Sequence, residues 1–332
     1  MAVRRKRGAR IAGLVTVLAV VTLIAAACGG DDNKLSDKTG VSLILDFVPG
    51  GVHAGIYSAE AEGYFDDVNI DIDIQAPTSS ADTLRLVLAG QSTIGIAPIA
   101  DVASLRAQGE DIQIFMALEQ VPLAALMSTE AIGITDPSQL SNGTVGVTGV
   151  PSDEAIAKVI LQTSGVDPST VDFITIGFDA VGNLIGQTVD AAIGFWSAEA
   201  VVLELEGETP LVFRPDEYGA PPYPELVFFA SSDTIAKRPK ILKAFTDAVA
   251  RGYEFALENQ DAAIADLNSL AEGIDVDFAN AEFNNVKPFY KGPGGGFGEI
   301  SDAAIADYLT WAVDVGVLES MPQDLITTDF LP

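Results

Sequence analysis

The chain has 332 residues, of which 48% are hydrophobic, with one cysteine, one histidine and a formal net charge of −29 at pH 7. A single cysteine excludes an internal disulfide framework and a thiolate zinc site, and a single histidine excludes a His-rich metal cluster. So acidic a chain repels a phosphate backbone, which excludes nucleic acid as a natural partner. We therefore expect neither metal nor cofactor, and no enzyme.

The N-terminus carries the pattern of an export signal. Five cationic side chains in residues 1–10 precede an apolar run, residues 11–27, that ends in small residues before Cys28. The ending resembles a bacterial lipobox, in which the thiol is acylated and the cysteine becomes the first mature residue. Removing residues 1–27 would take the charge to −34. The alternative is an uncleaved membrane anchor with an incidental cysteine.

Residues 28–40 are polar and Gly-rich, and we expect them to form a flexible tether. A regular alternation of patterns follows. β-branched and apolar runs of strand type alternate with amphipathic runs of helix type that begin at Ser or Pro and end at Gly. The strands are expected at 41–47, 69–75, 92–98 and 112–119, and the helices at 53–65, 79–91 and 99–110.

The alternation starts again near residue 131 and suggests a second, similar lobe. Its strands are expected at 144–149, 171–177 and 190–196, with a helix at 151–165. Long helical patterns at 240–260 and 302–318 are expected to pack back on the first lobe. These patterns predict lobe 1 at 41–129 plus 230–332 and lobe 2 at 130–229, with two crossovers between them.

Strands that alternate with helices predict an α/β fold, with parallel-rich sheets covered by helices. A ligand would then lie in a cleft between the lobes, at the carboxyl ends of the strands. Helix N-termini near Ser79, Ser80 or Ser152 offer backbone amides to an anionic group.

The stretch LDFVPGGVHAGIYSAEAEGYF, residues 45–65, resembles the start of extracytoplasmic solute-binding proteins related to the thiamine-pyrimidine synthases of fungi. That family shows L-D/N-W-x-P, then a histidine, an aromatic residue three or four positions on, and G-Y-F. Residues 94–109, 190–207 and 213–228 resemble later ligand-binding segments of the same family. The resemblance covers roughly residues 41–331 and implies a two-lobed periplasmic-binding-protein fold of type II.

The resemblance implies a lipid-anchored, monomeric receptor outside the cytoplasm that delivers a small heteroaromatic nutrient to the permease of an ABC importer. A thiamine pyrimidine precursor is the leading ligand. Riboflavin, or a nitrate-type or sulfonate-type solute, is the alternative. The synthase activity itself is a weaker alternative, because two family positions that hold a lysine and a histidine in the synthases are Ala97 and Asp101 here.

The resemblance also points to candidate ligand contacts. Phe47 and Trp196 would sandwich a flat ring, and His53 would stand at the cleft edge as a hydrogen-bonding group. The alternatives are core packing for the two aromatic residues and helix capping for His53. Glu199 would accept a hydrogen bond from an amine, or only favour the helix dipole. The weaker candidates are Asp46, which would orient His53 or the turn, Tyr57, Asp101 and Tyr223.

Two departures from the family pattern bear on the ligand. Phe47 stands where the family usually has Trp, and Gly50-Gly51 replaces a polar turn before the histidine. The glycines remove side-chain hydrogen bonds that a pyrimidine would use. The ligand is therefore expected to differ in detail from the family's best-known one.

Overall fold

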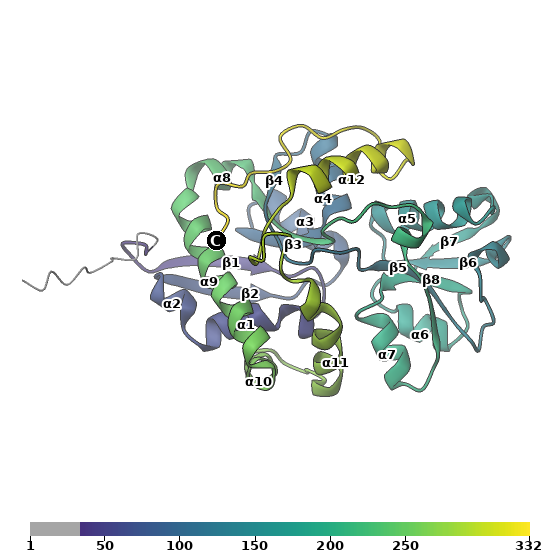
Figure 1. Ribbon diagram of the computed structural model, residues 1–332, viewed down its shortest axis with the longest axis horizontal. Helices are drawn as coiled ribbons and strands as arrows, with labels where there is room; N and C mark the ends of the chain where they lie inside the picture. The colour runs from purple at the N-terminus through teal and green to yellow at the C-terminus, as the bar shows by residue number, and fades with distance from the viewer. Residues whose placement is uncertain (1–33) are drawn as a thin grey trace, which may run out of the picture. The chain divides into compact units, whose positions relative to one another are not determined.

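Two five-stranded sheets organise the computed structural model, which describes residues 34–332 (Figure 1). The first sheet has the order β2-β1-β3-β10-β4 and the second β7-β6-β8-β5-β9. The strands of the first sheet are β1 (Thr39–Ile44), β2 (Ile70–Gln75), β3 (Ile94–Pro98), β4 (Ile112–Ala117) and β10 (Leu226–Ser231). Those of the second are β5 (Ala124–Thr129), β6 (Thr144–Val147), β7 (Asp172–Thr175), β8 (Ala191–Phe195) and β9 (Pro210–Phe213).

Each sheet is parallel apart from one antiparallel strand. β1 pairs in parallel with β2 and β3, whereas β10 runs antiparallel to β3 and β4. In the second sheet, β6 pairs in parallel with β7 and β8, whereas β5 runs antiparallel to β8 and β9. The predicted α/β class with parallel-rich sheets is confirmed.

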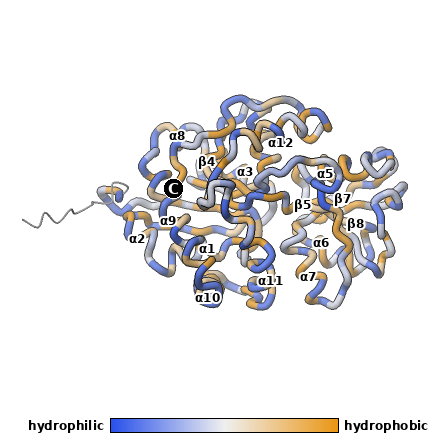
Figure 2. Tube along the Cα trace, viewed as in Figure 1, coloured by the Kyte–Doolittle hydropathy of each residue, from blue (hydrophilic) through white to orange (hydrophobic). Residues whose placement is uncertain are grey.

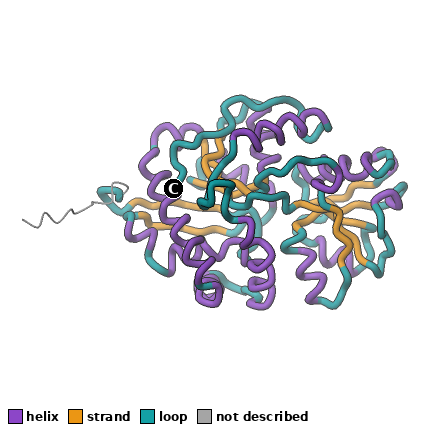
Figure 3. Tube along the Cα trace, in the orientation of Figure 1, coloured by secondary structure: helices purple, strands orange, loops and turns teal. Residues whose placement is uncertain are grey.

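The two antiparallel strands are also the ones that follow the crossovers. β5 comes directly after β4 but belongs to the second sheet, and β10 returns the chain to the first. The crossovers therefore lie at 118–123 and 214–225, before the predicted boundaries after residues 129 and 229. Figure 3 shows loop segments that join the two groups of strands. The difference arises because the apolar runs of β5 and β10, which the prediction gave to the preceding lobe, are the first strands of the following lobe.

Helices cover both sheets. Those around the first are α1 (Ala54–Ala61), α2 (Tyr64–Asp67), α3 (Ser80–Leu88), α4 (Ile99–Ala107), α8 (Ser232–Lys237), α9 (Pro239–Glu258), α10 (Gln260–Leu270), α11 (Val276–Val286) and α12 (Asp302–Asp314). Those around the second are α5 (Pro151–Thr163), α6 (Ala180–Ile185) and α7 (Glu199–Leu205). Short 3-10 turns are η1 (Gly51–His53), η2 (Pro137–Leu140), η3 (Pro168–Thr170), η4 (Pro215–Tyr218) and η5 (Lys287–Phe289).

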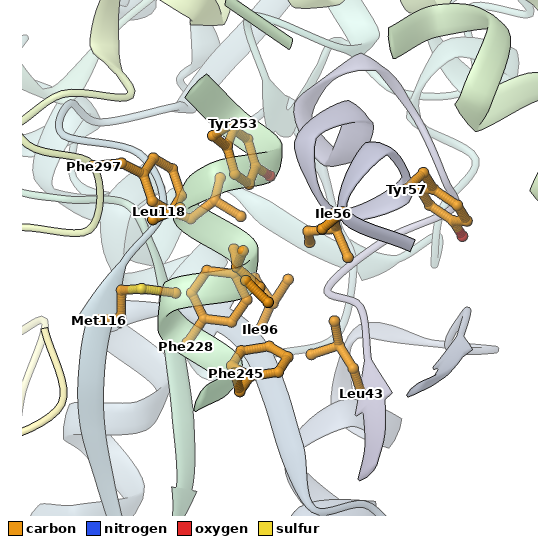
Figure 4. Close-up of a cluster of buried hydrophobic side chains, with 14 of the residues drawn as sticks. Leu43, Ile56, Tyr57, Ile96, Met116, Leu118, Phe228, Phe245, Tyr253 and Phe297 are labelled. Carbon is orange, nitrogen blue, oxygen red and sulfur yellow. The ribbon is translucent and has the colours of Figure 1, made fainter. Parts of the chain in front are cut away.

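The C-terminal helices return to the first lobe, as predicted. α9 packs on α1 so closely that a Cβ on Gly252 would lie 2.1 Å from the Gly55 carbonyl oxygen. Beneath this helix pair, Phe245 of α9 and Phe228 of β10 have ring centroids 5.7 Å apart and lie among Leu43 and Ile96 (Figure 4). Apolar segments run through the strands of both sheets (Figure 2). Burial of these side chains is the main force that holds the C-terminal helices in place.

The N-terminal part of the described chain is less free than the predicted tether. The Leu35 amide donates to the Val68 carbonyl oxygen at 3.2 Å, and β1 already begins at Thr39. The predicted signal peptide, residues 1–27, and the predicted lipidation site, Cys28, lie outside the described residues. Within residues 34–332, no helix combines the length and the apolar character needed to cross a membrane.

Candidate ligand-binding cleft

A cleft of about 510 Å³, its open mouth included, lies between the two sheets. Its lining residues include those at the ends of β1 and β3 in the first lobe and at the ends of β6 and β8 in the second. These are the carboxyl ends of parallel strands, where open α/β sheets place their ligands. The lining residues are Asp46, Phe47, Ser80, Ile96, Ala97, Pro98, Thr148, Val150, Asp153, Phe178, Ile193, Gly194, Phe195 and Glu199.

Aromatic rings from both lobes meet at this cleft. Phe47, just after β1, and Phe178, just after β7, have ring centroids 4.5 Å apart and an interplanar angle of 77°. Phe195, at the end of β8, adds a third ring to the lining. The predicted role of Phe47 as an aromatic wall of the cleft therefore fits its position, but its partner across the cleft is Phe178.

Trp196 does not line the cleft, so the predicted Phe47–Trp196 sandwich is wrong. Its indole N–H donates to the Pro122 carbonyl oxygen at 2.9 Å, and the Arg214 guanidinium lies 4.9 Å from its ring centroid. Trp196 comes just after the end of β8, and these contacts hold its ring outside the lining of the cleft.

Two carboxyl groups of the second lobe line the cleft. Asp153, in the first turn of α5, accepts hydrogen bonds from the Thr148 amide at 2.7 Å and the Thr148 hydroxyl at 2.5 Å. Glu199, in the first turn of α7, accepts from the Phe195 amide at 2.7 Å. Burial raises the pKa of Asp153 to about 6 and that of Glu199 to about 7. The predicted cleft position of Glu199 agrees with the structure.

The first lobe contributes Asp46, and His53 lies behind it. The His53 Nε2 atom is 2.9 Å from Asp46 Oδ1, and the imidazole is fully buried. His53 is thus not at the cleft edge, which corrects that prediction. It occupies the N-cap position of α1, but its side chain makes no capping hydrogen bond, so the helix-capping alternative describes only its place in the chain. The contact between Asp46 and His53 was expected.

Three weaker candidates lie outside the cleft. Tyr57 is buried in α1, on the core of the first lobe. Tyr223 is buried with its ring centroid 4.2 Å from that of Tyr308. Asp101 is buried in α4, and burial together with the nearby Asp153 raises its pKa to about 7. None of the three is among the residues that line the cleft.

The cleft is acidic and has no cationic side chain among its lining residues. Asp46, Asp153 and Glu199 are its ionisable groups, and no Lys, Arg or His side chain balances them. An anionic ligand would lose its hydration on binding and would gain no attraction from a cationic side chain in the lining. A flat, neutral or cationic ligand with hydrogen-bond donors matches both the carboxyl groups and the aromatic rings.

Comparison with known proteins assigns the chain to a family. A family model described as NMT1/THI5 like matches residues 51–263. The chain is also 30% identical over 252 residues to a formylaminopyrimidine-binding protein of Halalkalibacterium halodurans, covering 74% of this chain and 76% of the relative. The chain belongs to the NMT1/THI5-like family.

Other proteins similar to this NMT1/THI5-like chain are named for different functions. A Candida albicans 4-amino-5-hydroxymethyl-2-methylpyrimidine phosphate synthase is 22% identical over 261 residues, covering 75% of this chain and 77% of the relative. The alkanesulfonate-binding protein SsuA of Xanthomonas axonopodis, solved with MOPS, gives a TM-score of 0.68 at 12% identity, covering 89% of this chain and all of that one. The structural likeness confirms the periplasmic-binding-protein fold.

The two crossovers of this NMT1/THI5-like protein are joined by a buried carboxyl group. Glu225, at the end of the second crossover, accepts hydrogen bonds at Oε2 from the Leu123 amide at 3.0 Å and the Ala124 amide at 3.2 Å. The Tyr223 hydroxyl is 3.4 Å from the same oxygen. Burial raises the pKa of Glu225 to about 7. Sequence reasoning missed Glu225, because the backbone amides that it accepts from, those of Leu123 and Ala124, are far away in the sequence.

Sequence reasoning also missed Asp153 and Phe178 as cleft residues. Both had a usable signal. Asp153 lies in the first turn of a helix that follows a parallel strand, and Phe178 is an aromatic residue just after another strand. The carboxyl ends of parallel strands share one edge of a sheet, so both positions reach the cleft.

Proposed function

We propose that this protein is the solute-binding receptor of an ABC importer and that its cleft holds an aminopyrimidine of the thiamine-precursor type. One observation carries the proposal. The cleft between the lobes joins aromatic rings from both sides to three carboxyl groups, and no cationic side chain lines it. The relative from Halalkalibacterium halodurans, named for binding formylaminopyrimidine, supports the same ligand class.

The chemistry of an aminopyrimidine fits these groups. Its flat ring stacks on or meets the edges of Phe47, Phe178 and Phe195 without needing a fixed charge. Its exocyclic amine donates hydrogen bonds, which carboxylate oxygens accept. Burial raises the pKa of Glu199 to about 7, so its carboxyl group can accept from an amine when ionised and donate to a ring nitrogen when protonated.

A larger apolar groove leads to the cleft and shares Phe47, Phe178 and Glu199 with it. It runs between residues 272–278 of the first lobe and residues 198–206 of the second, and encloses about 1370 Å³, its open side included. We assign this groove to ligand entry. Bending at the two crossovers would then separate Phe47 from Phe178 to admit the ligand and return them to the contact seen here.

The anion-binding alternatives fit the cleft less well. Ser80, at the N-terminus of α3, offers backbone amides to a sulfonate or nitrate, but Asp46, Asp153 and Glu199 oppose any negative charge there. Riboflavin is uncharged, so the carboxyl groups do not oppose it, and its binding must be tested directly. A binding screen that includes methanesulfonate, nitrate and riboflavin decides among these ligand classes.

The synthase alternative lacks a group that the resemblance makes essential. In the synthases a lysine holds pyridoxal phosphate, and the matching position here is Ala97, which lines the cleft. No lysine is among the lining residues, so no amine is at hand for a Schiff base. We propose that the protein is a receptor without this activity. Incubation with pyridoxal phosphate should give no absorbance of an internal aldimine, and a stable aldimine band would revive the enzyme hypothesis.

The location and partners are further parts of the proposal. Residues 1–27 would be removed on export, and Cys28 would carry the lipid that holds a monomeric receptor at the outer face of the cell membrane, beside its permease. Mass spectrometry of the mature N-terminal peptide tests this. Acylated Cys28 is the expected result, with Cys28→Ser as the unacylated control, and an unmodified or uncleaved N-terminus would contradict it.

Function is tested by ligand binding to the purified protein from Cys28 onward. Formylaminopyrimidine and 4-amino-5-hydroxymethyl-2-methylpyrimidine are expected to raise the melting temperature, because a ligand at a hundred times Kd adds about 2.7 kcal/mol to the free energy of unfolding. Stabilisation by methanesulfonate or nitrate, but not by the pyrimidines, would overturn the proposal.

A further inference from the structure

The imidazole of His53 is held at both of its nitrogen atoms. The Gly50 backbone amide donates to Nδ1 at 3.3 Å, and Nε2 lies 2.9 Å from Asp46 Oδ1. Because a backbone N–H can only donate, Nδ1 is the acceptor and the ring proton resides on Nε2. His53 therefore donates its one N–H to Asp46 in a fixed direction.

The turn that carries His53 is itself clamped by side chains of the C-terminal helices. The Val52 amide donates to Glu282 Oε2 at 3.2 Å, and the Tyr253 hydroxyl donates to the Val52 carbonyl oxygen at 2.7 Å. The Tyr290 hydroxyl lies 3.2 Å from the same carbonyl oxygen. These contacts leave the backbone around His53 little freedom, and the ring itself cannot turn away from Asp46 without losing its two buried hydrogen bonds.

Gly50 and Gly51 make this clamping possible. A Cβ on Gly50 would lie 2.4 Å from Glu282 Oε2, and one on Gly51 would lie 2.2 Å from the Ala279 carbonyl oxygen. The glycines therefore admit α11 to the turn. The family resemblance places polar residues at these two positions. Here the close approach of α11 gives a structural reason for glycine, in addition to any change of ligand contacts.

Asp46 contacts His53 through one carboxyl oxygen, Oδ1. Among residues 34–332 His53 is its hydrogen-bond partner at Oδ1, and no other partner of the carboxyl group is found there. Asp46 also lines the cleft. With Oδ1 occupied and the carboxyl plane fixed by a rigid donor, Oδ2 is the oxygen left for a ligand.

We propose that His53 is a positioning residue that orients Asp46 so that Oδ2 accepts a hydrogen bond from the exocyclic amine of the ligand. The proposal rests on the proposed aminopyrimidine function and adds a specificity element to it. Recognition of an amine by a buried, pre-oriented acceptor discriminates strongly against an analogue that lacks the amine. His53 acts through Asp46 and makes no contact with the ligand.

Two substitutions separate positioning from mere support of the fold. His53→Gln keeps an acceptor and an N–H donor, whereas His53→Met keeps a similar bulk without either. The probes are 4-amino-5-hydroxymethyl-2-methylpyrimidine and the analogue with hydrogen in place of the 4-amino group, and the Kd for each is measured by calorimetry. The ratio of the two Kd values measures how well the protein recognises the amine.

His53→Met is expected to reduce this ratio about tenfold or more, with His53→Gln recovering a large part of it. In an Asp46→Leu background, His53→Met should change the ratio less than threefold, because the acceptor that His53 orients is already gone. A purely structural role would weaken the binding of both probes equally and leave the ratio unchanged, which would overturn the proposal. Failure of the unsubstituted protein to bind either probe would instead refute the proposed function.

Discussion

Phe47 of the first lobe and Phe178 of the second meet edge to face, with ring centroids 4.5 Å apart, at the junction of the cleft and the entry groove. The two rings follow strands of different sheets, so their contact links the first lobe to the second. The pair therefore forms part of the cleft wall from both sides.

Phe178→Ala is expected to weaken aminopyrimidine binding by about 10-fold to 100-fold, because it removes an aromatic wall and opens the cleft to the groove. Calorimetric titration of 4-amino-5-hydroxymethyl-2-methylpyrimidine measures the effect. Trp196→Phe is the matched control, since Trp196 lies outside the cleft, and its Kd should stay within about twofold of the unsubstituted value. An equal loss in both variants would contradict the assigned cleft wall.

Glu225→Ala is expected to destabilise the fold by about 2 to 4 kcal/mol. The substitution leaves the buried amides of Leu123 and Ala124 without their acceptor, and each unpaired buried donor costs about 1 to 3 kcal/mol. Urea unfolding followed by circular dichroism measures the change. The exposed Glu217, changed to Ala, should alter stability by less than about 0.5 kcal/mol. If both substitutions had equally small effects on stability, the stabilising role of Glu225 at the crossovers would be contradicted.

Gly51→Ala is expected to lower the melting temperature clearly, because the new Cβ would meet the Ala279 carbonyl oxygen at 2.2 Å and the Phe283 amide nitrogen at 2.6 Å. Both atoms belong to the backbone of α11, which must shift to make room, so a cost of about 1 to 3 kcal/mol follows. Gly40→Ala is the control, since its Cβ would have no atom within 4 Å. A neutral Gly51→Ala would mean that α11 does not dock on this turn.

Stability is expected to rise as the pH falls from 8 to 5. Burial raises the pKa of several carboxyl groups, so the folded chain binds protons more tightly than the unfolded chain, whose carboxyl groups have pKa values of about 4. The folded-state pKa values are about 6 for Asp153, about 7 for Asp101, Glu199 and Glu225, and about 8 for Glu282. Stability gained from these protons is lost as the pH rises from about 4 through those values.

Melting temperatures measured at constant ionic strength between pH 5 and pH 8 test this pH dependence. Glu225→Gln should flatten the slope, because it removes one titrating group at the crossovers and keeps a side-chain oxygen as acceptor. A melting temperature that is constant, or that rises toward pH 8, would show that these carboxyl groups are not protonated more readily in the folded chain.

The sequence predicts the fold well because the fold depends on local, repeated patterns. The alternation of apolar strands with capped helices is visible residue by residue, and it predicts Asp46 and Phe47 as the last residues of the first strand, although β1 already ends at Ile44. The lobe boundaries are harder, since AALMST of β5 and LVFFAS of β10 look like strands of either lobe. Only their pairing partners, which are distant in the sequence, decide which sheet they join.

The candidate site is predicted only in part, and the errors have a physical cause. Phe195 and Trp196 are adjacent aromatic residues at the end of β8, and the indole N–H of Trp196 is held by the Pro122 carbonyl oxygen of the first crossover. His53 has the chemistry of a ligand contact, but the approach of α11 over Gly50 and Gly51 buries it. Such contacts between remote segments leave no local pattern in the sequence.

The most direct test of the central claim is a calorimetric titration of the purified protein from Cys28 onward with formylaminopyrimidine, with methanesulfonate titrated in parallel. The acidic, aromatic cleft predicts saturable binding of the pyrimidine with one site per chain and no measurable binding of the sulfonate. Saturable binding of the sulfonate together with no heat from the pyrimidine would contradict the account.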